Sequence, residues 1–345
     1  MSLEAFAVPG LPELRAGDDI GDMIARSVAA AGFSLRDDDV VVVASKVVAK
    51  VEGRSVPAPD RAAAVEAETV RLVAARTLPD GRVTRVVQSR SGPVLAAAGV
   101  DASDVEPGTV LLLPVDPDGS ARRLRALLAA AAGVRPAVVV SDTTGRPWRE
   151  GVTDFALGAA GLVVLDDVRG QTDRFGRPME VTVRAIGDEV CGAADLVRGK
   201  ATGLPVAVVR GLGGYVTADD GPGAAGCVRV GPTDWFAHGH VEAVRAALGV
   251  PDGAVVPPAL DPASESLWDK VSRAVTVARW GRSGGTFVVE GSSVRVEGDD
   301  PFDTGAAVER LRAALWAEGL GAVVDRTPQA VVLQVSSSLD NRTKH

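Results

Sequence analysis

Val138, Val139 and Val140 form a short β-branched run that leads directly into the polar segment 141–151. Such a run, bounded by glycine and proline, predicts a buried strand. In open α/β sheets, ligands bind at the carboxyl ends of strands. The polar segment offers carboxylate, hydroxyl and guanidinium groups, which suit a metal ion and phosphate or carboxylate oxygens. A strand end with an Asx turn and a helix N-cap would explain the same residues equally well.

Strands and helices are predicted to alternate along the first 249 residues. The apolar run Val40–Ala44 predicts a second buried strand, and an alanine- and glutamate-rich stretch predicts a helix over 61–75. This pattern favours a mixed fold, α/β to α+β, in which mixed sheets are flanked by helices. Further strands are expected at 110–115, 162–165, 182–186 and 206–209, and further helices at 19–31, 121–132 and 188–197.

The composition changes after Gly249, where proline and glycine become frequent, as is typical of a linker. We therefore expect a first domain over 1–249, a linker over 250–258 and a small C-terminal α+β domain over 259–345. The sequence assigns no function to the small domain. Its expected helices are 265–278 and 306–318, and its expected strands are 286–290, 293–297, 321–326 and 330–336.

Charge and cysteine usage exclude several function classes. The formal net charge of −8 argues against a sequence-independent nucleic-acid-binding protein. Only Cys191 and Cys227 occur, which supports neither a disulfide framework nor a paired-cysteine zinc site. The sequence shows no secretory signal and no apolar run long enough to span a membrane, so we expect a cytoplasmic protein without a membrane partner.

Asp101, Asp142 and Thr143 are the candidate oxygen ligands for a metal ion. Hard divalent cations such as Mg²⁺ and Mn²⁺ bind carboxylate, hydroxyl and phosphate oxygens. Two carboxylates at separate strand ends would bring one such ion against a nucleotide phosphate. A single surface aspartate is otherwise most often a turn former or a helix cap.

Ser45, Lys46 and Lys50 lie at and beyond the end of the predicted strand Val40–Ala44. Lysines in this position can neutralise a polyphosphate, although a solvated, charged strand end has the same composition. The dipeptide Gly199-Lys200 is followed by alanine instead of serine or threonine, so a standard phosphate-binding loop is not expected.

As an ordered set, these motifs resemble the coenzyme F420-0:L-glutamate ligase family, which adds γ-linked glutamates to the F420 precursor. The resemblance covers about residues 5 to 245. The matching segments are Val8–Leu14, Gly17–Asp19, Val43–Arg54, Ala98–Ser103, Ser141–Arg146, Asp167–Gly170 with Asp173 and Gly176–Arg177, and Gly199–Lys200 through Pro205–Val206 to Arg210–Gly211.

The resemblance implies positions for the nucleotide and the metal. The metal ligands would be Asp101, Asp142 and Thr143, holding Mg²⁺ or Mn²⁺, with K⁺ as a further candidate ion. Lys200 matches a glutamine that contacts a metal in archaeal members, so either water fills that position or Lys200 meets a phosphate. Asp104 falls where the family often has asparagine. The implied nucleotide-binding residues are Leu11, Pro12, Glu13, Leu14, Ser45, Lys46, Lys50, Asp104, Arg198, Gly199 and Lys200.

The resemblance also implies the reaction and the partners. GTP would be the co-substrate, an acyl phosphate the intermediate, and L-glutamate the amine that displaces phosphate. A homodimer is expected from the family alone, and no FMN site is expected because the roughly 90 residues after the linker are too few for a flavin-binding domain. The alternatives are a ligase for another phosphorylated carboxylate and a non-catalytic nucleotide- or metal-binding regulator. The catalytic candidates are Asp142, Lys200 and Arg146, and the substrate-binding candidates are Arg149, Arg169 and Arg177.

Overall fold

A computed structural model of the whole chain divides it into two compact units. One unit comprises residues 1–70 and 88–233, and the other comprises 71–87 and 234–345. Each unit has a hydrophobic core of its own. Most of the expected linker lies outside the described residues, but its first residue, Val250, packs in the core of the second unit. The structure describes residues 2–77, 80, 82–103, 105–251, 254, 256, 266–282, 284–327 and 330–337.

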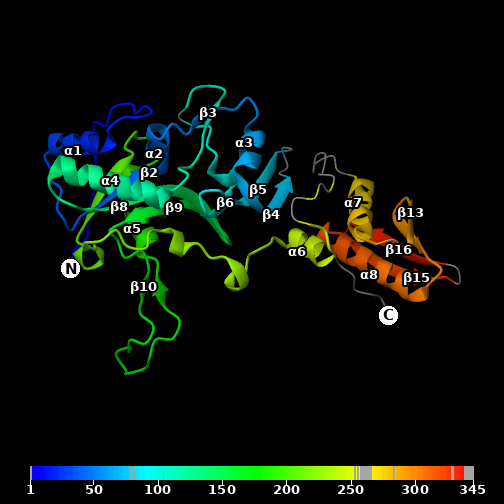
Figure 1. Cartoon of the computed structure of the whole chain (residues 1–345). Helices are drawn as coiled ribbons and strands as arrows, with labels where there is room; N and C mark the ends of the chain where they lie inside the picture. The colour runs from blue at the N-terminus through cyan, green and yellow to red at the C-terminus, as the bar shows by residue number, and fades with distance from the viewer. Residues whose placement is uncertain are drawn as a thin grey trace. The chain divides into compact units, whose positions relative to one another are not determined.

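A five-stranded sheet forms the centre of the first unit, in the order β1-β12-β2-β8-β9 (Figure 1). β2 and β8 are parallel, and the other neighbouring strands are antiparallel. The buried strands predicted at 40–44 and 138–140 are confirmed. The strands are β1 (Glu4–Ala7), β12 (Val206–Arg210), β2 (Val40–Ala44), β8 (Ala137–Arg146) and β9 (Arg149–Ala160).

Helices cover both faces of this sheet, with α1 (Ile20–Ala30) and α4 (Pro117–Ala132) on one face and α5 (Ile186–Arg198) on the other. Successive side chains of a strand point to opposite faces, so Val41 packs in the core beneath α1 and α4, while Val42 packs in the core beneath α5. Because both faces of β2 are covered, its residues are all apolar instead of alternating between apolar and polar. The predicted mixed α/β to α+β fold with flanking helices is confirmed.

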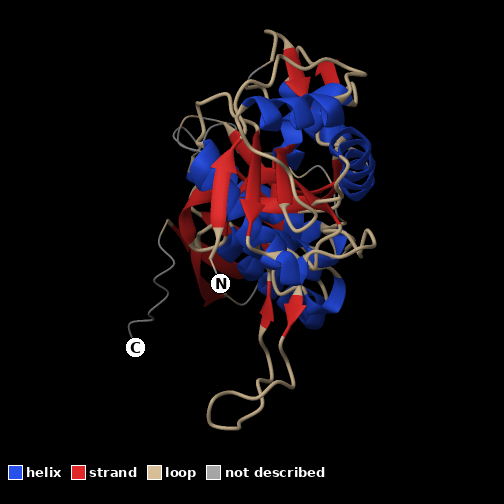
Figure 2. Ribbon diagram, turned by 90° about the vertical axis from the view of Figure 1, so that its left-hand side faces the viewer, coloured by secondary structure: helices blue, strands red, loops and turns tan. Residues whose placement is uncertain are grey.

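Shorter elements complete the first unit. The strands β10 and β11 form the base of a long hairpin arm that projects away from the sheet in both views (Figures 1 and 2). The strand expected at 162–165 is wrong, because Leu162 makes only an isolated bridge with Val216. The shorter elements of the first unit are α2 (Ser45–Val51), β3 (Ser55–Pro57), α3 (Arg61–Ala67), β6 (Val94–Ala96), η1 (Ala97–Gly99), β7 (Thr109–Leu111), β10 (Asp166–Asp167), β11 (Val183–Arg184), η2 (Gly213–Tyr215), η3 (Ala225–Cys227) and η4 (Gly231–Thr233).

Two further expectations are corrected by the structure. The helix expected over 61–75 ends at Ala67, and β4 (Thr69–Thr77) follows, because the β-branched residues after Glu68 favour an extended chain. The strand that begins at Ala137 does not stop at the polar segment. β8 continues to Arg146 and pairs with β9, with a register shift between Val140 and Ser141. The polar segment 141–151 therefore forms the tip of a β-hairpin, made of the end of β8, the turn and the start of β9, instead of a strand end followed by a turn.

The second unit contains an antiparallel four-stranded sheet in the order β13-β14-β16-β15, whose core also includes α7 and α8. β4 and β5 (Val83–Ser89) contribute residues 71–87 to this unit. Glu242 of α6 is buried and accepts a hydrogen bond from the Ala75 N–H at 3.0 Å. The other elements are α6 (His240–Ala247), α7 (Leu267–Arg279), β13 (Thr286–Glu290), β14 (Ser293–Glu297), α8 (Pro301–Ala317), β15 (Gly321–Arg326) and β16 (Val331–Ser336).

No helix among the described residues combines the length and the apolar character that a membrane crossing requires.

Candidate active site

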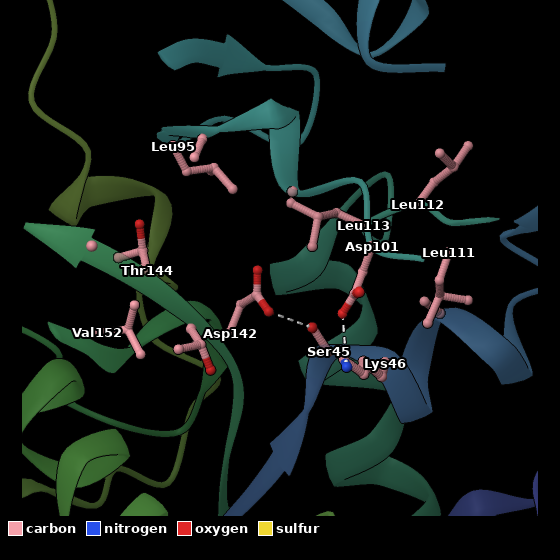
Figure 3. Close-up of a pocket in the computed structure, with 15 residues that line it drawn as sticks. Ser45, Lys46, Leu95, Asp101, Leu111, Leu112, Leu113, Asp142, Thr144 and Val152 are labelled. Atoms are coloured by element: carbon pink, nitrogen blue, oxygen red, sulfur yellow. Dashed lines mark hydrogen bonds and ion pairs between the residues drawn. The ribbon is translucent and has the colours of Figure 1, made fainter. Parts of the chain in front are cut away.

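A cavity of about 320 Å³ opens in the first unit beside the carboxyl end of β2 and the second half of β8 (Figure 3). It contains five of the residues singled out from the sequence, although they come from three separate stretches of the chain. The carboxylates of Asp101 and Asp142 point into the same space (Figure 3). The lining residues are Ser45, Lys46, Ala49, Leu95, Ala96, Gly99, Asp101, Leu111, Leu112, Leu113, Asp142, Thr143, Thr144, Gly145 and Val152.

Strand pairing brings Asp142 against Ser45. In the parallel ladder between β2 and β8, Ala44 lies opposite Ser141. The residues that follow them, Ser45 at the start of α2 and Asp142 within β8, both line the cavity. The Ser45 hydroxyl donates a hydrogen bond of 2.9 Å to Asp142 Oδ1. Burial raises the pKa of Asp142 from 3.8 to about 6, and the charges of Asp154 and Asp101 act in the same direction. Ionisation of this carboxyl is therefore less favourable than that of an exposed aspartate, and a nearby cation would favour it.

Asp101 has the opposite electrostatic environment. Its Oδ2 lies 2.7 Å from Lys46 Nζ, and its Oδ1 accepts the Ser103 N–H at 2.7 Å. Burial raises the pKa of Asp101, but the hydrogen bonds from Lys46 and Ser103 outweigh burial and leave the pKa below its ordinary value. Lys46 also donates to the Ser103 hydroxyl at 2.6 Å. Asp101 is thus an ionised carboxylate at the cavity wall.

The oxygen atoms at the cavity suit a divalent cation whose remaining ligands are water molecules or substrate oxygens. Among the described residues, no group of three or more histidine, cysteine, aspartate or glutamate side chains is arranged to hold a metal ion. Mg²⁺ commonly binds through one or two carboxylates together with water and substrate phosphates. Asp101, Asp142 and Thr143 all line the cavity, and the two carboxylates provide such a partial set.

A buried ionic network lies next to the cavity and centres on Asp154 of β9. Thr143 is directly opposite Asp154 in the β8–β9 ladder, and its hydroxyl donates to Asp154 Oδ1 at 2.6 Å. Arg198, which is only 4% exposed, pairs with Asp154 Oδ2 and also donates to the Ser141 hydroxyl at 2.9 Å. The structure therefore places the Arg198 side chain inside the protein, where it holds β9 to α5.

Lys200 completes this network from the loop after α5. Its ammonium group lies 2.8 Å from Asp154 Oδ1, 2.6 Å from Asp195 Oδ1 and 3.0 Å from Thr143 Oγ1. Burial lowers the pKa of Lys200, but the hydrogen bonds to Asp154 and Asp195 outweigh burial and raise it above its ordinary value. A lysine has three N–H donors, and here all three have acceptors. Direct contact with a phosphate would require Lys200 to give up one of them.

The remaining predicted residues lie outside the cavity lining. In the segment 11–14, Leu14 is buried in the core, and Glu13 pairs with Lys50 at 2.9 Å. Gly199 caps the end of α5, and Asp104 lies outside the described residues. The arginines predicted to be catalytic or to bind substrate are exposed, and one of them, Arg169, pairs with Asp167. These exposed arginines are Arg146, Arg149, Arg169 and Arg177.

Sequence inspection missed Asp154 and Asp195. Asp154 directly precedes the apolar stretch 155–160, and a charge at the border of such a stretch is a signal in itself. Recognising it requires the hairpin register, which pairs Asp154 with Thr143. Asp195 carries no local signal, because its role depends on where the loop after α5 places Lys200.

The sequence is similar to known proteins over the part that contains this cavity. The model of the family described as F420-0:Gamma-glutamyl ligase matches residues 10–211. A coenzyme F420:L-glutamate ligase of Methanopyrus kandleri is 38% identical over 250 residues, which are 67% of this chain and 96% of that protein. Proteins of the same name from Archaeoglobus fulgidus and Halorubrum lacusprofundi are 40% and 43% identical, over 61% and 60% of this chain and 89% and 87% of their own lengths.

Proposed function

The chain belongs to the F420-0:gamma-glutamyl ligase family, and from that premise we propose that it is a GTP-dependent ligase. In this proposal it joins L-glutamate to the coenzyme F420-0 precursor and builds γ-linked glutamate, with release of GDP and phosphate. The relatives named coenzyme F420:L-glutamate ligase support the ligase activity and the substrate class. Use of GTP and of Mg²⁺ or Mn²⁺ belongs to the proposal.

One observation supports the proposal most strongly. Two carboxylates with opposite pKa shifts, Asp101 and Asp142, line a single cavity within the family-matched residues. Bringing a burial-destabilised anion next to an ionised one is unfavourable in the absence of a cation. A site of this kind is suited to a divalent ion that arrives with a nucleotide phosphate.

The chemistry follows from the need to activate a carboxylate. Transfer of the γ-phosphoryl group of GTP to the acceptor carboxylate forms an acyl phosphate and releases GDP. The amine of L-glutamate then attacks the acyl carbon, an amide bond forms as the bond to phosphate breaks, and the amine loses a proton. Phosphoryl transfer of this type depends mainly on positioning and charge neutralisation. When bound, Mg²⁺ or Mn²⁺ would supply charge neutralisation at the phosphate oxygens.

The residues of this chain have corresponding tasks. Asp101, Asp142 and Thr143 would hold the divalent ion at the cavity wall. Lys46 keeps Asp101 ionised and stands at the cavity with its own positive charge. Ser45 fixes the orientation of the Asp142 carboxylate through its hydrogen bond.

The test is an assay with purified protein, GTP, Mn²⁺, L-glutamate and the F420-0 precursor, followed by mass spectrometry. The expected result is a product heavier by one or more glutamate residues, formed together with GDP. Replacing GTP by ATP, and omitting Mn²⁺, serve as controls for nucleotide and metal dependence. Nucleotide binding without any product would instead indicate a regulatory protein, and product formation only with another phosphorylated carboxylate would indicate a different acceptor.

A further inference from the structure

The backbone adopts a strained turn just before Asp101. Three successive residues have φ angles in the left-handed region: Ala97 at 52°, Ala98 at 53° and Gly99 at 71°. Glycine adopts this region readily, whereas the Cβ of any other L-residue comes too close to the following carbonyl oxygen. The two alanines therefore store strain, and such strain persists only where the surrounding structure holds the backbone in place.

This left-handed turn, residues 97–99, lies against the wall of the cavity. Gly99 and Asp101 line the cavity, and so does Ala96, directly before the turn. A Cβ atom at Gly99 would lie 2.5 Å from Leu113 Cδ1 and 3.0 Å from Leu95 Cδ1, and both leucines also line the cavity. Because the turn packs so closely, any relaxation of its backbone would change the cavity wall at Asp101.

The peptide group between Val100 and Asp101 is hydrogen-bonded at both of its polar ends. Arg61, the first residue of α3, donates a hydrogen bond of 2.5 Å from Nη2 to the Val100 carbonyl oxygen. The Asp101 N–H donates to the Leu111 carbonyl oxygen at 3.0 Å, and the Leu111 N–H donates to the Asp101 carbonyl oxygen at 2.7 Å. Because a peptide group is planar, bonds at both ends fix its orientation and thus the direction in which the Asp101 side chain leaves the backbone.

We propose that Arg61 is a positioning residue, which clamps the left-handed turn and thereby holds the Asp101 carboxylate in place for the cation of the active site. The proposal rests on the proposed function in one respect, the use of a divalent cation held by Asp101. Arg61 itself lies outside the cavity lining. Its hydrogen bond to Val100 comes from a side chain, so a substitution removes the clamp and leaves the bonds between Asp101 and Leu111 available.

Loss of the clamp should displace the carboxylate. Without the guanidinium, the Val100 carbonyl is released and the strained turn can relax, which rotates the peptide group before Asp101. Loss of an outer partner of a metal ligand typically weakens metal affinity by about 10–100-fold. Arg61 acts through the backbone of the ligand, so we expect a loss of about tenfold, at the lower end of that range.

The experiment measures Mn²⁺ affinity by electron paramagnetic resonance, with a non-hydrolysable GTP analogue present and no acceptor, so that no turnover is needed. Arg61→Met should weaken Mn²⁺ binding about tenfold. The matched control is Arg90→Met, because Arg90 is also exposed and donates to a backbone carbonyl, that of Ala67 at 2.6 Å, at the other end of α3. This control should leave Mn²⁺ affinity within about threefold of the wild type.

Two double variants separate positioning from a general loss of stability. In an Asp101→Asn background, Arg61→Met should cause no further loss of Mn²⁺ affinity, because both changes act on the same ligand. Ala97→Gly removes strain from the turn, since glycine adopts a positive φ readily. Arg61→Met combined with Ala97→Gly should therefore bind Mn²⁺ more tightly than Arg61→Met alone.

Several results would overturn the inference. They are an unchanged affinity of Arg61→Met, equal losses in Arg61→Met and Arg90→Met, additive losses with Asp101→Asn, and no recovery with Ala97→Gly. If Arg61→Met does not fold, Arg61→Gln takes its place and the same outcomes apply.

The result also distinguishes this inference from the proposed function. A wild-type protein that forms product but binds no Mn²⁺ under these conditions overturns the inference and leaves the ligase activity standing. A wild-type protein that binds Mn²⁺ with the predicted dependence on Arg61, but forms no product, supports the inference and removes the proposed reaction.

Discussion

Replacing Asp142 by asparagine should stabilise the metal-free protein while it abolishes turnover. Burial raises the pKa of Asp142 from 3.8 to about 6, and each pKa unit corresponds to about 1.4 kcal/mol. The ionised side chain therefore costs the folded state about 3 kcal/mol at neutral pH. Asparagine has nearly the same shape and can still accept the Ser45 hydrogen bond, but it carries no charge to desolvate.

The sign of the effect gives it a characteristic pH dependence. The folded state binds the Asp142 proton more tightly than the unfolded state, so the wild-type protein loses stability as pH rises from about 4 to about 6. The asparagine variant has no such loss. The stability gained by Asp142→Asn should therefore increase from about 1.5 kcal/mol at pH 5 to about 3 kcal/mol at pH 7 and then stay constant.

Native-state hydrogen exchange of the β2 and β8 amides, with divalent ions removed by a chelator, measures this difference within the first unit. Asp101→Asn is the control from the same cavity: the pKa of Asp101 is lowered, so this variant should be less stable than the wild type. Added Mn²⁺ should stabilise the wild type and not Asp142→Asn. A destabilised Asp142→Asn, or a gain that does not depend on pH between 5 and 7, would refute the electrostatic reasoning.

Three further predictions concern other parts of the first unit. Burial raises the pKa of Cys227 to about 11, so its alkylation rate, followed by mass spectrometry, should rise about tenfold per pH unit up to about pH 10; a plateau near pH 9 would contradict this. Arg210→Met should cost about 3–5 kcal/mol in urea unfolding, because it leaves the fully buried Asp39 without its bidentate partner. Arg169→Met, which removes an exposed pair, should leave the urea unfolding midpoint nearly unchanged, and equal losses of stability in the two variants would disprove the argument from burial. Trp148 adopts a left-handed φ of 58° in the β8–β9 turn, so Trp148→Gly should raise stability by up to about 1 kcal/mol, and a lower Tm would rule out backbone strain at this turn.

Several strands rich in β-branched residues could be predicted from the sequence almost residue by residue. The strands Val40–Ala44, Thr286–Glu290 and Ser293–Glu297 have the predicted bounds, because β-branched runs between polar or glycine residues leave few alternatives. The helix predicted over 61–75 failed at Glu68, since alanine and glutamate dominate the first half and conceal the β-branched second half.

The candidate site could be predicted as a set of residues but not as a geometry. Ser45, Lys46, Asp101, Asp142 and Thr143 do line one cavity. The sequence placed this segment after the end of a strand, whereas β8 continues through it and turns back as β9. Partners that depend on that hairpin register could not be predicted from local sequence patterns. The alignment of the two strands, and not the spacing of residues along the chain, decides which residues lie opposite one another.

The non-contiguous second unit has a consequence for the order in which the chain is synthesised. Ala75, in the β4–β5 segment of this unit, donates its N–H to Glu242, which lies 167 positions further along the chain. At about 5–20 residues per second, the ribosome needs roughly 8–33 s to make that intervening chain. During this interval β4 and β5 belong to the nascent chain, and α6, which carries Glu242, has not yet been synthesised. Slower translation between residues 88 and 234 should therefore lengthen a state that is open to chaperones and to aggregation.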